Sequence, residues 1–166
     1  MKRFRILTGG LALLLVLLLS ACDTAAPAAS RKTVDLPTLQ ASMLEAAPSL
    51  PDMISVTGGL PDSKRAFSYL SDFPYEKVEN FLLSYATAGT ADEIAVISVK
   101  NPADAEAAAD SLRTHLNNRK ALFRQYKPEE AARAEQGLVF TKDQYAVLII
   151  CGDSQAVKSA FEAAVT

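Results

Sequence analysis

The feature that most constrains this chain is its N-terminus, where an apolar run is followed almost at once by a cysteine. Residues 2–5 carry three positive charges, and residues 6–19 are apolar apart from a short Thr-Gly-Gly stretch. This run is shorter than the roughly 20 apolar residues that a membrane-spanning helix needs. It has the layout of a secretory signal. We therefore expect these residues to lie outside the folded domain.

The segment Leu19-Ser-Ala-Cys22 looks like a lipobox, in which small residues precede a cysteine that receives a diacylglycerol. We predict that residues 1–21 are a lipoprotein signal peptide and that Cys22 is the lipidation site, carrying palmitate-type acyl chains. The lipid would hold the chain on the extracytoplasmic face of the cell membrane. The alternatives are an ordinary secretory signal with an unrelated cysteine, or an uncleaved anchor helix.

Removal of residues 1–21 leaves 14 basic against 19 acidic side chains, a formal charge of −5. An acidic domain is a poor nucleic-acid binder, because the phosphate backbone rewards clustered Lys and Arg. It also gains nothing from an anionic bilayer surface. We therefore predict attachment to the membrane through the lipid on Cys22 and no nucleic-acid partner. A protein of the cell envelope is the expected kind of partner, with its identity open.

The rest of the chain divides into a tether and one domain. Residues 22–34 begin with the lipidated cysteine and are otherwise small and polar, a composition that predicts a flexible tether. Residues 35–166 are predicted to form a single domain that opens with a helix at Asp35-Leu36-Pro37. Cys151 follows an apolar run, so we expect a buried thiol there and no disulfide.

The apolar periodicity of the domain predicts its elements. Helices are expected at about 36–47, 62–70, 101–126 and 129–136, and from 153 onward, and strands at 78–85, 93–100, 138–141 and 144–151, with 53–56 as an optional short strand. Two strand–strand–helix units thus follow an N-terminal helix. Because short turns join antiparallel strands, we predict an α+β fold. Its four-stranded, largely antiparallel sheet would be packed on one face by helices.

The residues that carry chemistry form no recognisable catalytic set. His115 is the single histidine, with no potential metal ligand three or four residues away, and a surface or boundary position is favoured. The acid pairs Asp92-Glu93 and Glu129-Glu130 are predicted to be capping and solubilising charges. A Gly-x-Ser-x-Gly elbow, a phosphate loop and zinc-ligand spacing are all missing from the sequence. We predict no catalytic residues, no cofactor and no metal.

Four aromatic residues gather before the first of the long strands. They are Phe67, Tyr69, Phe73 and Tyr75. One interpretation makes them part of the core, which lacks tryptophan; the other makes them a ligand groove. The core interpretation is favoured, because exposed aromatic patches are uncommon on monomers.

Three segments of the domain, together with the lipobox, carry a family resemblance. They are residues 92–100 (DEIAVISVK), 124–130 (RQYKPEE) and 144–153 (QYAVLIICGD). Together they resemble the DUF4358 family, a domain of unknown function found in bacterial lipoproteins, over roughly residues 35–165. The resemblance implies an extracytoplasmic lipoprotein, with no catalytic residues to transfer.

Three functions are compatible with these observations. The leading hypothesis is a non-catalytic binding or interaction domain tethered to the membrane. The second is an accessory lipoprotein of the cell envelope that binds a small ligand through the aromatic cluster. The third is a hydrolase that uses His115. Because no catalytic set is recognisable, we expect that the chain is not an enzyme.

Overall fold

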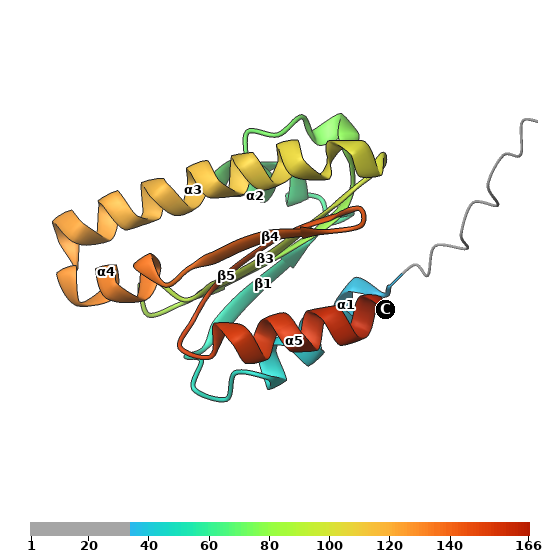
Figure 1. Ribbon diagram of the computed structural model, residues 1–166. Coiled ribbons are helices and arrows are strands. Elements are labelled where there is room, and N and C mark those ends of the chain that lie inside the picture. Colours follow the sequence, from blue (N-terminus) through green and yellow to red (C-terminus); the bar gives the residue numbers. More distant parts are fainter. Residues whose placement is uncertain (1–33) are drawn as a thin grey trace, which may run out of the picture. The chain divides into compact units, whose positions relative to one another are not determined.

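The computed structural model describes residues 34–166 (Figure 1). The predicted signal peptide, Cys22 and most of the predicted tether lie outside the described residues. The α-helices are α1 (Leu36–Glu45), α2 (Ser63–Leu70), α3 (Ala105–Tyr126), α4 (Pro128–Glu135) and α5 (Ser154–Val165). The strands are β1 (Met53–Thr57), β2 (Val78–Ala86), β3 (Glu93–Val99), β4 (Leu138–Lys142) and β5 (Tyr145–Ile150). Short 3-10 turns, Tyr75–Lys77 and Pro102–Asp104, precede β2 and α3.

The five strands form one antiparallel sheet in the order β1-β2-β3-β5-β4. The α+β class is confirmed, and the expected count of four strands is wrong by one. The optional strand at 53–56 is real, because Met53–Thr57 pair with residues 82–86 along the outer edge of β2. The apolar pattern of residues 53–57 is weak because β1 is an edge strand, which other elements cover only in part. Ile54, for example, is exposed.

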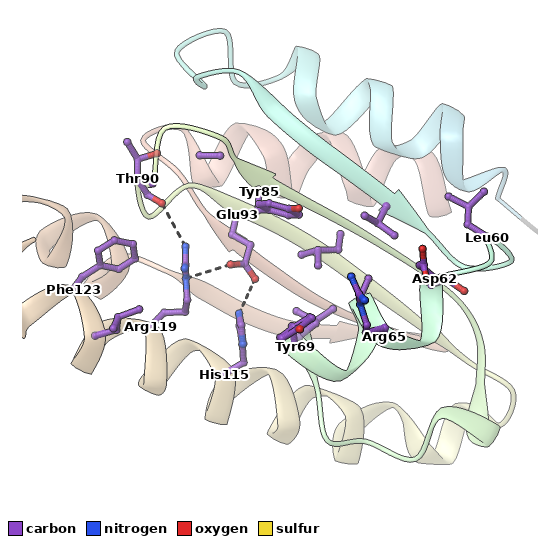
Figure 2. A pocket seen from close by; sticks show the side chains of 18 of the residues that line it. Leu60, Asp62, Arg65, Tyr69, Tyr85, Thr90, Glu93, His115, Arg119 and Phe123 are labelled. Atoms are coloured by element: carbon purple, nitrogen blue, oxygen red, sulfur yellow. Dashed lines mark hydrogen bonds and ion pairs between the residues drawn. The ribbon is translucent and has the colours of Figure 1, made fainter. Parts of the chain in front are cut away.

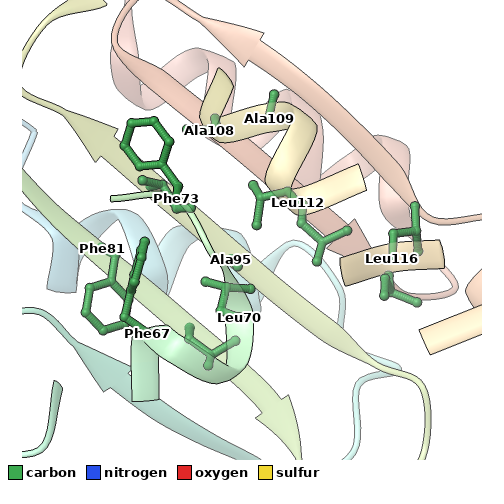
Figure 3. Close-up of a cluster of buried hydrophobic side chains, with 14 of the residues drawn as sticks. Phe67, Leu70, Phe73, Phe81, Ala95, Ala108, Ala109, Leu112 and Leu116 are labelled. Atoms are coloured by element: carbon green, nitrogen blue, oxygen red, sulfur yellow. The ribbon is translucent and has the colours of Figure 1, made fainter. Parts of the chain in front are cut away.

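Helices cover both faces of the sheet, which corrects the one-faced packing predicted from the sequence. One core lies under α2, α3 and α4 and includes Phe67, Phe81 and Leu112 (Figure 3). The other lies under α1 and α5 and includes Met43 and Phe161. The sheet has two covered faces because β3 and β5 are buried at every residue. Successive side chains of a strand point to opposite faces, so both faces of these strands present apolar side chains. A sheet with two apolar faces needs a layer on each.

Local signals fix the helix starts as the sequence predicted. The Asp35 carboxylate accepts the backbone N–H of Thr38 at 3.1 Å, which satisfies a free donor of the first turn of α1. Asn101 does the same for Ala103 at 3.2 Å before α3. At its other end α3 stops before Pro128, and α4 packs back against it. This reversal brings the side chains of α4 to the turn between β2 and β3.

None of the helices within residues 34–166 is both long enough and apolar enough to cross a membrane.

Candidate functional site

An open groove runs along the sheet face that α2 and α3 share. On β2, Phe81, Leu83 and Tyr85 point to this face; Phe81 is fully buried beneath Phe67 of α2, whereas Tyr85 is exposed. The helical cover therefore runs out toward the end of β2. The space left there is about 960 Å³. This volume falls within the range of small-molecule binding sites.

The groove collects most of the large hydrophobic side chains that are exposed in the described part of the chain. Six large hydrophobic side chains in the described part of the chain are exposed, and four of them line the groove: Leu60, Tyr69, Tyr85 and Leu122. They come from the β1–α2 loop, α2, β2 and α3. Figure 2 shows Leu60, Tyr69 and Tyr85 around one opening together with charged side chains. Single exposed apolar residues need no explanation, but a contiguous set marks a contact or ligand surface.

A charged cluster of Glu93, His115 and Arg119 closes one end of the groove (Figure 2). The Glu93 carboxylate lies at the start of β3 and its side chain is only 5% exposed. Its Oε1 is 2.7 Å from Nε2 of His115, and its Oε2 is 3.3 Å from Nε of Arg119. His115 and Arg119 stand one turn apart on α3, so they share the face that meets Glu93. A carboxylate buried this deeply needs such partners.

Apart from its ion pair with Glu93, Arg119 makes two long hydrogen bonds and one contact with an aromatic ring. Its Nη2 is 3.4 Å and 3.5 Å from the carbonyl oxygens of Thr90 and Ala91, beyond the usual range for such hydrogen bonds. Its guanidinium carbon lies 4.8 Å from the ring centre of Phe123, a cation–π contact. Its Nε is buried and makes no hydrogen bond.

A second buried carboxylate, Asp92, lies beside the cluster. It is 2% exposed, and its oxygens accept from Arg133 of α4 at 2.8 Å and from the Thr90 hydroxyl at 2.8 Å. Glu130 of α4 accepts the backbone N–H of Ala91 at 2.9 Å. The prediction of Asp92-Glu93 as solubilising charges is therefore wrong, because both carboxylates are buried: α3 supplies the partners of Glu93, and α4 supplies Arg133 to Asp92. Glu129 and Glu130 occupy the first turn of α4, as predicted, but the Glu130 side chain is only 13% exposed and is therefore not a solubilising charge.

The structure separates the four aromatic residues singled out in the sequence. Phe67 and Phe73 are buried in the core. Tyr75 packs edge-on against Phe67, with ring centres 5.2 Å apart, and its hydroxyl lies 3.3 Å from the Ser63 hydroxyl. Only Tyr69 lines the groove, where it is 74% exposed. Three of the four thus belong to packing and one to the candidate site.

His115 and Cys151 are the two other residues whose side chains carry chemistry, and both are largely buried. His115 is a boundary residue with a 17% exposed side chain, and its ring is paired with Glu93. Cys151 is buried, as predicted, and burial raises the pKa of its thiol, which keeps it in the unreactive protonated form. In the described part of the chain no three His, Cys, Asp or Glu side chains come together as metal ligands. Cys22, the predicted lipidation site, lies outside the described residues.

The antiparallel sheet has helices on both faces and a largely apolar groove, with Glu93, His115 and Arg119 at one end and Asp62 and Arg65 at the other. These features define an α+β domain with a ligand-sized site. Residues 54–151 match the family model described as "Domain of unknown function (DUF4358)". The chain therefore belongs to the DUF4358 family. The matched residues include every strand except the first residue of β1, and they include the whole charged cluster. No curated protein and no solved structure matches the chain.

Proposed function

We propose that this chain is a lipid-anchored, extracytoplasmic binding protein whose ligand occupies the groove between α2 and α3. The observation that carries the binding role is the gathering of Leu60, Tyr69, Tyr85 and Leu122, all exposed, around one opening with a charged end. Tyrosine and arginine are the residue types that dominate binding hot spots. The anchoring role rests on the basic start, the apolar run and the lipobox of residues 2–22.

The groove supports binding better than hydrolysis. Hydrolysis through a covalent intermediate needs a nucleophile activated by a neighbouring base. The hydrogen bond that His115 makes is to Glu93, and no hydroxyl or thiol among residues 34–166 is hydrogen-bonded to its ring. Glu93 in turn has both oxygens directed at His115 and Arg119. Glu93, His115 and Arg119 are therefore paired with one another, and they place charged groups at the end of an apolar groove.

Binding in the groove is tested by a thermal-shift screen of small molecules against the purified protein. A ligand at about 100 times its Kd stabilises the folded state by about 2.7 kcal/mol, which raises Tm by several degrees. We expect ligands that stabilise the wild type to lose their effect on Tyr85→Ala and Tyr69→Ala. Tyr126→Ala is the matched control, because Tyr126 is an exposed tyrosine on α3 that does not line the groove. Ligands whose shifts are the same in all three variants would place binding elsewhere.

Anchoring is tested by Cys22→Ser. We expect this variant to incorporate no labelled fatty acid in growing cells, because serine lacks the sulfur that accepts the diacylglycerol. The chain should then be found as a precursor or as a released protein with a normally folded domain. Cys151→Ser is the matched control and should label like the wild type, since its thiol is buried. A Cys22→Ser protein that stays normally processed and membrane-bound would contradict the proposal.

A further inference from the structure

Arg119 has hydrogen-bonding capacity that the protein does not use. A guanidinium carries five N–H donors. The hydrogen bonds of Arg119 come from Nη2 alone, and both are long, at 3.4 Å and 3.5 Å. The Nε faces Glu93 at 3.3 Å without a hydrogen bond and is buried. The side chain is 22% exposed, so the donors that the protein leaves unused can be reached from the groove. A cation in this state is stabilised by an incoming hydrogen-bond acceptor, and most strongly by an anion.

The acid next to Arg119 does not fill this role. Glu93 directs Oε1 at His115, 2.7 Å away, and only Oε2 at Arg119. The other acid lining the groove, Asp62, lies at the opposite end beside Arg65 (Figure 2). Arg65 makes no ion pair with any residue of the described chain. In the described chain, Arg119 therefore has Glu93 Oε2 and two distant carbonyl oxygens as its acceptors, and the Nη1 donors make no hydrogen bond.

The surface that continues from Arg119 is apolar. In Figure 2 the groove passes from Arg119 along Tyr85 toward Tyr69 and Leu60. Leu122, three residues after Arg119 and so about one turn further along α3, also lines the groove. A molecule that filled this space would bury hydrocarbon or an aromatic ring, and the tyrosines offer flat faces on which a ring can stack.

We propose that the ligand of the groove is an amphiphilic carboxylate, a small molecule whose carboxylate pairs with the guanidinium of Arg119 and whose apolar body lies along Tyr85 and Tyr69. The inference rests on the proposed binding function and adds the chemical class of the ligand. The carboxylate matches the planar fork of an arginine. The apolar body accounts for the exposed side chains, which a free inorganic anion would leave uncovered.

The test compares 4-phenylbutyrate with 4-phenylbutan-1-ol, which has the same apolar body without the charge, and with acetate, which has the charge without the body. The full-length protein is placed in phospholipid nanodiscs, and each compound is titrated by ligand-detected NMR with empty nanodiscs as the blank. We expect 4-phenylbutyrate to bind about tenfold more tightly than the alcohol, the ratio that a charge-assisted hydrogen bond supports. Acetate should not bind detectably.

Variants of the protein identify the side chain that causes the preference for 4-phenylbutyrate over the alcohol. Arg119→Gln should weaken 4-phenylbutyrate about tenfold, to the level of the alcohol, and leave the alcohol unchanged. Tyr85→Ala should weaken both compounds by the same factor. Arg124→Gln is the matched control, because Arg124 is on α3, pairs with Glu135 and does not line the groove; it should change neither compound. Alcohol binding by Arg119→Gln reports that the groove is intact. If that variant is unfolded, Arg119→Lys replaces it and should lower the acid preference several-fold.

Different results would contradict the proposed carboxylate class and the proposed binding function. Equal affinity of acid and alcohol, or an acid preference that persists in Arg119→Gln and Arg119→Lys, would overturn the carboxylate class. If Tyr85→Ala still weakened both compounds in that case, the groove would remain the binding site. If neither aromatic compound bound, the amphiphile proposal would be wrong, and the thermal-shift screen with its groove variants would then decide the binding function alone.

Discussion

Replacing Phe81 with alanine is expected to lower the free energy of unfolding by about 3–5 kcal/mol, the usual cost of truncating a buried phenylalanine. The ring of Phe81 is fully buried, and its centre lies 5.2 Å from that of Phe67 and 6.4 Å from that of Tyr75. Small domains are stable by only about 5–15 kcal/mol. This one substitution therefore removes a large part of the stability of the domain.

The same loss is expected from Phe161→Ala on the opposite face of the sheet. Phe161 is fully buried between Phe140 and Tyr145, with ring centres 5.6 Å and 5.8 Å away. Urea unfolding followed by far-UV circular dichroism is the measurement, because the chain has no tryptophan to report by fluorescence. Tyr126→Ala, at an exposed site, should change stability by no more than about 0.5 kcal/mol. A Phe161→Ala protein as stable as Tyr126→Ala would contradict a sheet covered on both faces.

Arg133→Ala is expected to cost about 2–3 kcal/mol, somewhat below the roughly 3–5 kcal/mol for losing one partner of a fully buried pair. The substitution leaves the Asp92 carboxylate 2% exposed and held by the Thr90 hydroxyl alone among its side-chain partners. The cost is reduced because Arg133 is itself 37% exposed, so water already shares in its charge.

The matched control for this prediction is Arg124→Ala. Arg124 pairs with Glu135, and both side chains are exposed, so its loss should cost at most about 1 kcal/mol. The two variants are compared by urea unfolding under one set of conditions. Equal costs would mean that the Asp92–Arg133 pair is no more valuable than a surface ion pair, and that α4 is not held to the β2–β3 turn by charge.

Most of the fold could be predicted because its signals are local. Helix starts such as Asp35-Leu36-Pro37 and the turns between consecutive strands depend on neighbouring residues. The number of helical layers that cover the sheet is indicated by a different feature of the sequence. The β5 run Tyr-Ala-Val-Leu-Ile-Ile is apolar at odd and even positions alike, which indicates a strand buried on both faces. The strand–strand–helix order does not contain this information, so the one-faced packing that it predicts is wrong.

The candidate site was harder to predict, because its parts come from segments far apart in the sequence. The groove exists where the helical cover ends over Tyr85, and that depends on the lengths and angles of α2 and α3. In the sequence Glu93 is an ordinary charge at a strand start, because no neighbouring residue indicates that α3 places His115 and Arg119 beside it. One local signal was available: His115 and Arg119 are four residues apart on a helix, and so share a face.

The helices α1 and α5 both fall outside residues 54–151, the part that matches the family model, yet they supply the helical cover of the second sheet face. They contact each other, although most of the domain separates them along the chain (Figure 1). Joining such distant segments carries a high loop-closure entropy, which slows folding. Until α5 docks, the back of the sheet is an uncovered apolar surface prone to self-association. We therefore expect the completion of this layer to be a step at which folding competes with aggregation.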